Sequence, residues 1–147
     1  ASRGGGFASI DGDAVIRDSS FTGNSGSETG GAIFNIGTAF GTAPMEIENC
    51  LVSGNTAPQG GGIATSMGET GVVGCTLSEN AAEDGGGIYN SGLMTIIRTT
   101  LSVNETSGSG GGILNLGAIT IQESTFSDNH AHQGGGLASA GGDGGAY

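Results

Sequence analysis

The chain repeats itself about every 25 residues, and this period restricts its fold more than any other feature. Glycine runs begin at Gly4, Gly30, Gly60, Gly85, Gly110 and Gly134, so successive runs are separated by 26, 30, 25, 25 and 24 residues. Asparagine recurs with a similar period, at Asn24, Asn55, Asn80, Asn104 and Asn129. Because two unrelated residue types share one period, the sequence predicts a stack of similar structural units.

Alignment on these asparagines places apolar residues in three columns. One column lies eight residues before the asparagine and holds Ile16, Ile47, Val72, Ile96 and Ile121. Another lies three residues before it and holds Phe21, Val52, Leu77, Leu101 and Phe126. The third follows the glycine run and holds Phe7, Ile33, Ile63, Ile88, Ile113 and Leu137. Each repeat therefore has three apolar anchors, separated by glycine-rich and polar corners.

The segments that carry these anchors are short, and many contain β-branched residues, as in GGGIYN and LMTII. They predict strands, since the 3.6-residue periodicity of a helix is absent. Three short strands per repeat form one turn of a parallel β-helix, and the crossover rule for parallel strands makes it right-handed. We therefore expect an all-β fold: a right-handed parallel β-helix (solenoid) of about five coils, each of 24–30 residues with three short strands.

Stacking at about 4.8 Å per coil puts equivalent residues on top of one another. The column from Ile16 to Ile121 is then a buried ladder, and the inward asparagines from Asn24 to Asn129 hydrogen-bond one another along the axis, as stacked amides do in cross-β structure. By its length, the chain 1–147 is a single β-helix domain. We expect it to be a segment of a longer solenoid or a subunit that stacks on others.

Acidic residues dominate the charge of the chain. The formal net charge is −11, lysine is absent, and the cations are Arg3, Arg17 and Arg98. This balance repels phosphate backbones and anionic membrane surfaces, so we expect no nucleic-acid partner. No stretch approaches the roughly 20 apolar residues of a membrane span, and we expect no membrane insertion by this segment.

One insertion interrupts the repeat. The second unit carries the extra segment TAFGTAP, from Thr38 to Pro44, and the apolar pattern resumes at Met45 and Ile47. The insertion must therefore bulge outwards as a loop, with Phe40 at its tip. Because loops on a regular scaffold are where specific recognition concentrates, Thr38, Phe40 and Pro44 mark a candidate recognition loop.

The two cysteines, Cys50 and Cys75, each stand five residues before a repeat asparagine. They share a column with Ser19, Thr99 and Ser124, so we expect them to stack in adjacent coils. A Cα separation of about 4.8 Å permits a disulfide, although parallel Cβ vectors make its torsion awkward. Two interpretations stay open for an extracellular protein: a disulfide, or a reduced and buried pair.

Two short motifs recur along the chain: GGAI at Gly30 to Ile33, with GGGI or GGGL in the later units, and FTGN at Phe21 to Asn24, with FSDN at Phe126 to Asn129. In these motifs the sequence resembles the repeats of the polymorphic outer membrane proteins, which are autotransporter adhesins known from chlamydiae. The resemblance extends over nearly the whole chain and also fits the wider pectate-lyase-like β-helix group. It implies a surface-exposed passenger with an adhesive or structural role. Membrane insertion is not among the properties that this resemblance leads us to expect of the segment.

No group of residues predicts a catalytic, cofactor or metal site. Glu46 and Glu48 form a carboxylate pair on one outward face, but neighbouring repeats supply no further acid, and Arg17 is a ready partner for Glu48. His130 and His132 offer two metal ligands without a third. The acidic turn Glu83-Asp84 lies near Glu79 but lacks a calcium-roll consensus. We read these groups as solvated surface.

Three function hypotheses follow. The leading one is a non-enzymatic structural or adhesive module at the cell surface or outside the cell, without cofactors. A second is a fragment of a carbohydrate-active β-helix enzyme, either a polysaccharide lyase or a glycoside hydrolase. A third is a filament subunit, because a solenoid ends in unpaired strands that must be capped, continued or joined to another copy. The expected partners are the solenoid ends of other copies and cell-surface components, with carbohydrate as a further candidate.

Overall fold

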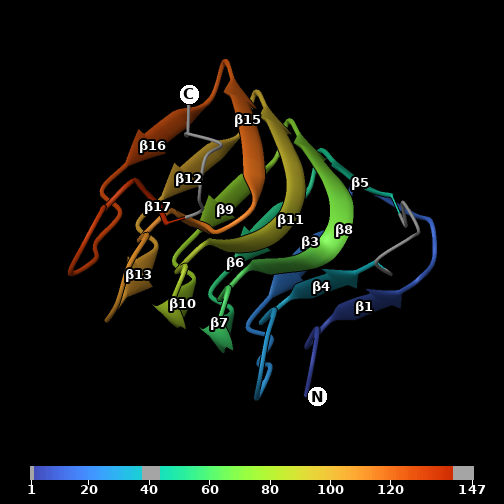
Figure 1. The fold of residues 1–147 in the computed structure, drawn as a ribbon, viewed down its shortest axis with the longest axis horizontal. Helices are drawn as coiled ribbons and strands as arrows, with labels where there is room; N and C mark the ends of the chain where they lie inside the picture. Colours follow the sequence, from blue (N-terminus) through green and yellow to red (C-terminus); the bar gives the residue numbers. More distant parts are fainter. Residues whose placement is uncertain (1, 38–43, 141–147) are drawn as a thin grey trace.

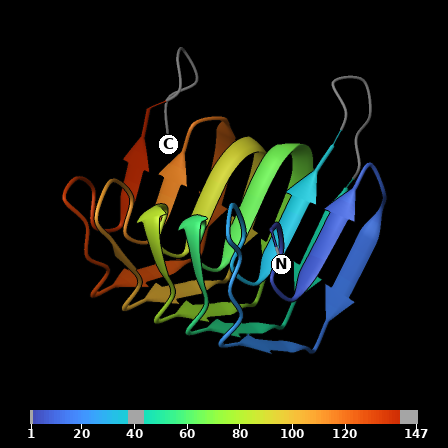
Figure 2. The same ribbon diagram turned by 90° about the horizontal axis from the view of Figure 1, so that it is seen from below.

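The computed structural model describes residues 2–37 and 44–140, and every regular element within these ranges is a β-strand (Figure 1). All the strand pairings are parallel. Each strand pairs with its counterpart one repeat away, so the chain winds into a solenoid whose coils follow one another in sequence order (Figure 2). The predicted class, a parallel β-helix of about five coils, is confirmed.

Three sheets run along the solenoid axis. The largest has nine strands: β1 (Phe7–Ile10), β2 (Ala14–Arg17), β4 (Ile33–Ile36), β5 (Met45–Glu48), β8 (Ile63–Val73), β11 (Ile88–Ile97), β14 (Ile113–Asn115), β15 (Ala118–Gln122) and β17 (Leu137–Ser139). The second has five: β3 (Ser20–Thr22), β6 (Leu51–Ser53), β9 (Thr76–Ser78), β12 (Thr100–Ser102) and β16 (Thr125–Ser127). The third has three: β7 (Thr56–Gln59), β10 (Ala81–Asp84) and β13 (Glu105–Thr106).

The nine-stranded sheet bends within each coil. β8 and β11 pass through the bend as single long strands, whereas the other coils break there into two shorter ones (Figure 1). The insertion lies at this bend, between β4 and β5. Its residues 38–43 fall outside the described ranges, and beyond them Met45 pairs with Thr70 and Ile47 with Val72. The coil therefore returns to register directly after the insertion.

The core consists of columns of inward side chains. In the isoleucine column, Ile16 pairs with Ile47, and the register then continues through Val72 and Ile96 to Ile121. The three inner members, Ile47, Val72 and Ile96, are fully buried. Neighbouring β-branched side chains one coil apart remove each other from water, which makes this column a main source of hydrophobic stabilisation.

The corners between strands require the left-handed backbone conformation. The first glycine of each run has a φ of 58° to 71°, and a Cβ on Gly60 would overlap the carbonyl oxygen of Ile63. The corner before each repeat asparagine is also left-handed, but there a Cβ on Gly54 would make only an ordinary contact, at 4.0 Å from the backbone N of Gly23, and Val103 occupies the equivalent place with a φ of 56°. Only the first corner therefore excludes a side chain by overlap as well as by conformation.

This difference predicts unequal effects of two alanine substitutions. Gly60→Ala combines left-handed strain with a backbone clash and should lower the free energy of unfolding by about 3 kcal/mol or more. Gly54→Ala carries the conformational strain alone and should cost about 1 kcal/mol. Chemical denaturation of both variants measures the difference, and equal losses would show that the Gly60 corner relaxes around a side chain.

Candidate functional site

The repeat asparagines form a continuous hydrogen-bonded ladder. The backbone N–H and the Nδ2 of Asn55 both donate to Oδ1 of Asn80, at 3.0 Å each. Nδ2 of Asn80 donates to Oδ1 of Asn104 at 2.9 Å and, in the opposite direction, to the carbonyl of Val52 at 2.9 Å. The same pattern joins Asn24 to Asn55 and Asn104 to Asn129. Each inner amide thus uses both its oxygen and its two N–H groups, which is how a buried polar side chain is tolerated.

The cysteines belong to a second ladder of small polar side chains. Cys50 and Cys75 are both buried free thiols in the structure, so of the two open interpretations it contains the reduced pair. The backbone N–H of Cys50 donates to Sγ of Cys75 at 3.4 Å, and that of Cys75 donates to Oγ1 of Thr99 at 3.3 Å. Thr99 in turn donates its N–H to Oγ of Ser124 at 3.1 Å.

The thiols occupy the place that hydroxyls occupy in other coils. Sγ of Cys75 lies 3.4 Å from the carbonyl oxygens of both Val73 and Ile47, and Oγ1 of Thr99 lies at the equivalent positions in its own coil. Burial raises the pKa of the Cys75 thiol to about 11. A neutral, buried thiol is a poor nucleophile, so Cys75 has the chemistry of a structural element.

The outward carboxylates Glu46 and Glu48 both lie on β5. Glu48 accepts a hydrogen bond from Nε of Arg17 at 2.7 Å, an ion pair between adjacent coils, and this pairing raises the pKa of Arg17. The carboxylate of Glu46 lies over Gly71 of the next coil. An exposed ion pair of this kind contributes little stability.

The remaining titratable groups are dispersed. His130 and His132 lie on an exposed turn, and a ring nitrogen of His130 lies 2.9 Å from the carbonyl oxygen of Asp128. Oδ1 of Asp84 accepts a hydrogen bond from the N–H of Ser109, whereas Glu79 and Glu83 are exposed. Within residues 2–37 and 44–140, no three His, Cys, Asp or Glu side chains are arranged to hold a metal ion.

The candidate recognition loop is only partly described. Thr38 and Phe40 lie outside the described residues, and Pro44 is half-buried, with its carbonyl accepting a hydrogen bond from the N–H of Ala14 at 3.0 Å. In the described part of the chain, no helix is long and apolar enough to cross a membrane.

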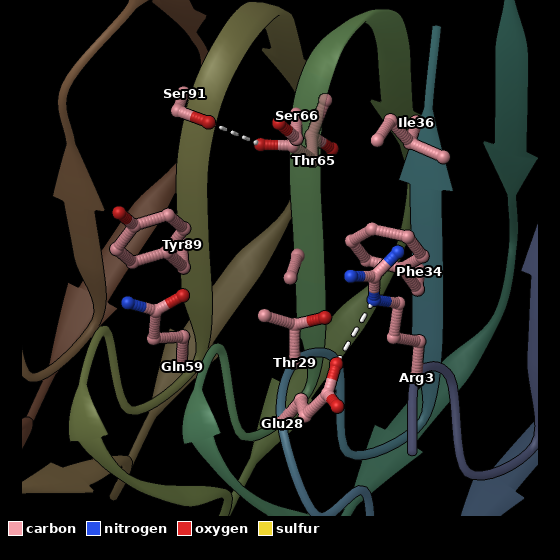
Figure 3. Close-up of a pocket in the computed structure, with 11 residues that line it drawn as sticks. Arg3, Glu28, Thr29, Phe34, Ile36, Gln59, Thr65, Ser66, Tyr89 and Ser91 are labelled. Atoms are coloured by element: carbon pink, nitrogen blue, oxygen red, sulfur yellow. Dashed lines mark hydrogen bonds and ion pairs between the residues drawn. The ribbon is translucent and has the colours of Figure 1, made fainter. Parts of the chain in front are cut away.

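A groove that the sequence analysis did not identify lies between the nine-stranded and three-stranded sheets (Figure 3). Its volume is about 220 Å³, and its floor is a row of outward side chains from β4, β8 and β11: Phe34, Ala64 and Tyr89. Arg3, Glu28, Thr29 and Gln59 form one wall. The sequence does carry a signal for this groove, because Phe34 and Tyr89 follow the isoleucine of GGAIF and GGGIY, where inward and outward positions alternate.

These features define the chain as a β-solenoid repeat protein. The family model for the Chlamydia polymorphic membrane protein repeat matches residues 18–36, which confirms the resemblance in that stretch. The matched residues contain both FTGN and GGAI, and they run from the corner before β3 to the end of β4. No curated protein and no solved structure shows significant similarity to the chain.

The thiol ladder gives a prediction for stability and its pH dependence. Because Ser and Thr fill the same column, Cys75→Ser should retain the hydrogen bonds and cost no more than about 1.5 kcal/mol at pH 7. In the wild type, the folded thiol holds its proton up to about pH 11, above the pKa of the unfolded thiol. The free energy of unfolding should therefore fall as the pH rises through this interval.

The serine variant lacks this titrating group, so denaturation curves measured from pH 8 to 11 should fall less steeply for Cys75→Ser than for the wild type. Both proteins keep Tyr89, whose pKa burial also raises, and its contribution cancels in the comparison. Parallel curves for the two proteins would contradict a buried, protonated Cys75.

Proposed function

We propose that the chain is a non-enzymatic structural and adhesive module of an extracellular or cell-surface protein, and that its ends join to build a rod. The matched repeat supports a surface location, because it belongs to a family of membrane proteins. The observation that carries the proposal is the composition of the two solenoid ends. Their core side chains are apolar and partly exposed, most residues of their edge strands are uncharged, and the hydrogen-bonding groups of the asparagine ladder at one end match those at the other.

Exposure of core residues is confined to the ends. The core residues that stay partly exposed all belong to the first coil or to the last strands: Phe7, Ala14, Phe21, Ile119, Ile121, Phe126 and Leu137. Their counterparts in the inner coils, such as Ile63 and Leu77, are fully buried. In every inner coil the apolar core side chains are covered by the next coil. Burial of the exposed apolar side chains at each end would therefore favour the binding of a further coil there.

The strands at the ends carry few features that prevent pairing. Within the described residues, β1 and β3 at one end and β15, β16 and β17 at the other each pair on one side only, and none contains a charged residue or proline. Proteins that must remain monomeric place lysine, proline or bulges on such edges. Among the described strands, β2 also pairs on one side only, and it carries one charge, at Arg17. The outer strands of the three-stranded sheet are β7, which contains Pro58, and β13, which contains Glu105.

The asparagine ladder makes the two ends of the solenoid different, because, within the part of the chain that the structure describes, one end carries unused hydrogen-bond donors and the other an unused acceptor. At the C-terminal end, the backbone N–H of Asn129 and one N–H of its side chain find no acceptor among the described residues. At the N-terminal end, Oδ1 of Asn24 receives no hydrogen bond from the described chain. Donors at one end and an acceptor at the other match head to tail, as they do between successive coils. Such a heterologous contact does not close on itself, so it builds an open rod.

The surface carboxylates support a non-enzymatic role. Glycoside hydrolysis needs two carboxylates placed on either side of a scissile bond, whereas Glu46 and Glu48 project from one strand and Glu48 is held by Arg17. A rod of repeated, rigid units is suited to extending from a cell surface and to adhesion, and neither role requires catalytic turnover.

Assembly of the 147-residue chain tests the proposal. The wild type should form oligomers of increasing size as its concentration rises, seen by sedimentation velocity, and rods by electron microscopy. Asn129→Asp replaces the two side-chain donors with a carboxylate that would face Oδ1 of Asn24 in the next copy, so this variant should sediment as a monomer.

The matched control is Asp128→Asn, which changes a neighbouring exposed side chain at a left-handed corner and should assemble like the wild type. Denaturation of each variant separates loss of assembly from loss of folding. A wild type that stays monomeric at high concentration, or an Asn129→Asp variant that assembles normally, would contradict end-to-end joining.

A further inference from the structure

The groove between the nine-stranded and three-stranded sheets has a rigid, amphipathic floor. Phe34, Ala64 and Tyr89 occupy equivalent positions in three successive coils; Phe34 and Ala64 are buried, whereas Tyr89 is partly exposed. Coils about 4.8 Å apart place the two aromatic positions about 10 Å from each other. The exposed part of Tyr89 is therefore the aromatic surface that a ring-shaped ligand in the groove can contact.

The arginine of the groove is held in place before any ligand arrives. The guanidinium of Arg3 lies over the ring of Phe34, 5.7 Å from its centre, and its Nε donates to Oε2 of Glu28 at 3.0 Å. Phe34 is covered in this way, whereas Tyr89 stays partly exposed. The remaining N–H groups of Arg3 and the second carboxylate oxygen of Glu28 offer donors and an acceptor side by side.

The other polar groups of the groove are uncharged. Oγ1 of Thr29 is buried and has no hydrogen-bond partner, which is unusual for a buried hydroxyl. Gln59, Ser66, Ser91 and the hydroxyl of Tyr89 add further donors and acceptors around the rim (Figure 3). Ser91 donates to the carbonyl of Thr65 at 3.2 Å, so its hydroxyl oxygen remains free to accept.

We propose that this groove binds one ring of a neutral saccharide, a hydroxyl-rich ligand that presents an apolar face to Tyr89 and donors and acceptors to Arg3, Glu28 and Thr29. The charge of Arg3 is balanced by Glu28 within the groove, and the chain as a whole carries −11, so an acidic sugar is disfavoured. The volume of about 220 Å³ is below that of a site for a complete drug-sized ligand, which fits one unit of a longer glycan.

This proposal rests on the proposed role as a surface module, to which it adds the class of ligand. It is tested by binding of the 147-residue chain to a glycan array that contains neutral, sialylated and sulfated glycans, followed by titration calorimetry with the best neutral oligosaccharide. The wild type should bind neutral glycans, and Arg3→Ala and Tyr89→Ala should each weaken binding about tenfold or more.

Arg17→Ala is the matched control. Arg17 also donates Nε to a glutamate of the next coil but lies outside the groove, so its loss should leave glycan binding unchanged. Sedimentation of the same samples reports assembly separately, which distinguishes failure of the groove from failure of the rod. Absence of neutral-glycan binding, equal binding by all three variants, or preference for acidic glycans or for an arginine-rich peptide would each overturn the proposal.

Discussion

The asparagine ladder is the interaction on which the solenoid depends. Asn55, Asn80 and Asn104 have no exposed surface, and each satisfies its entire amide through the coils above and below. A buried amide that lost these partners would cost more than the ladder contributes, so the ladder enforces one register between coils. The apolar columns supply most of the stabilisation and exclude a one-residue slip, but a two-residue slip would keep apolar side chains inward, and apolar packing alone discriminates poorly against it.

The corners follow from this requirement. The residue before each asparagine is left-handed, and so is the residue before each member of the hydroxyl and thiol ladder, such as Asn49 before Cys50 and Gly74 before Cys75. These corners aim the following side chain into the interior, where it meets its counterpart one coil away. The two ladders therefore stand where the chain changes direction, and strands between them carry the apolar columns.

Much of this architecture can be predicted from the sequence because stacking converts a period in sequence into a contact in space. The isoleucine and asparagine columns, and the return to register at Met45, follow from spacing alone. The contacts of the Cys50 and Cys75 thiols do not, because they depend on which carbonyl oxygens the thiols face. Nor does the groove, since Arg3 covers Phe34 and pairs with Glu28 from segments whose corner geometry lies outside the apolar pattern. The spacing also does not predict which end of the asparagine ladder carries hydrogen-bond donors and which carries the acceptor, because that depends on the direction of each hydrogen bond.

Removal of one amide from the middle of the ladder tests this account most directly. Asn80→Ala deletes the acceptor of two N–H groups of Asn55 and the donors to Asn104 and Val52, all at a fully buried residue. Ser78→Ala removes a single half-buried hydroxyl contact, to Ser53, from the same coil and serves as the control. Chemical denaturation should show a loss of about 3 kcal/mol or more for Asn80→Ala and less than about 1 kcal/mol for Ser78→Ala. Similar stability of the two variants would contradict a ladder that holds the coils in register.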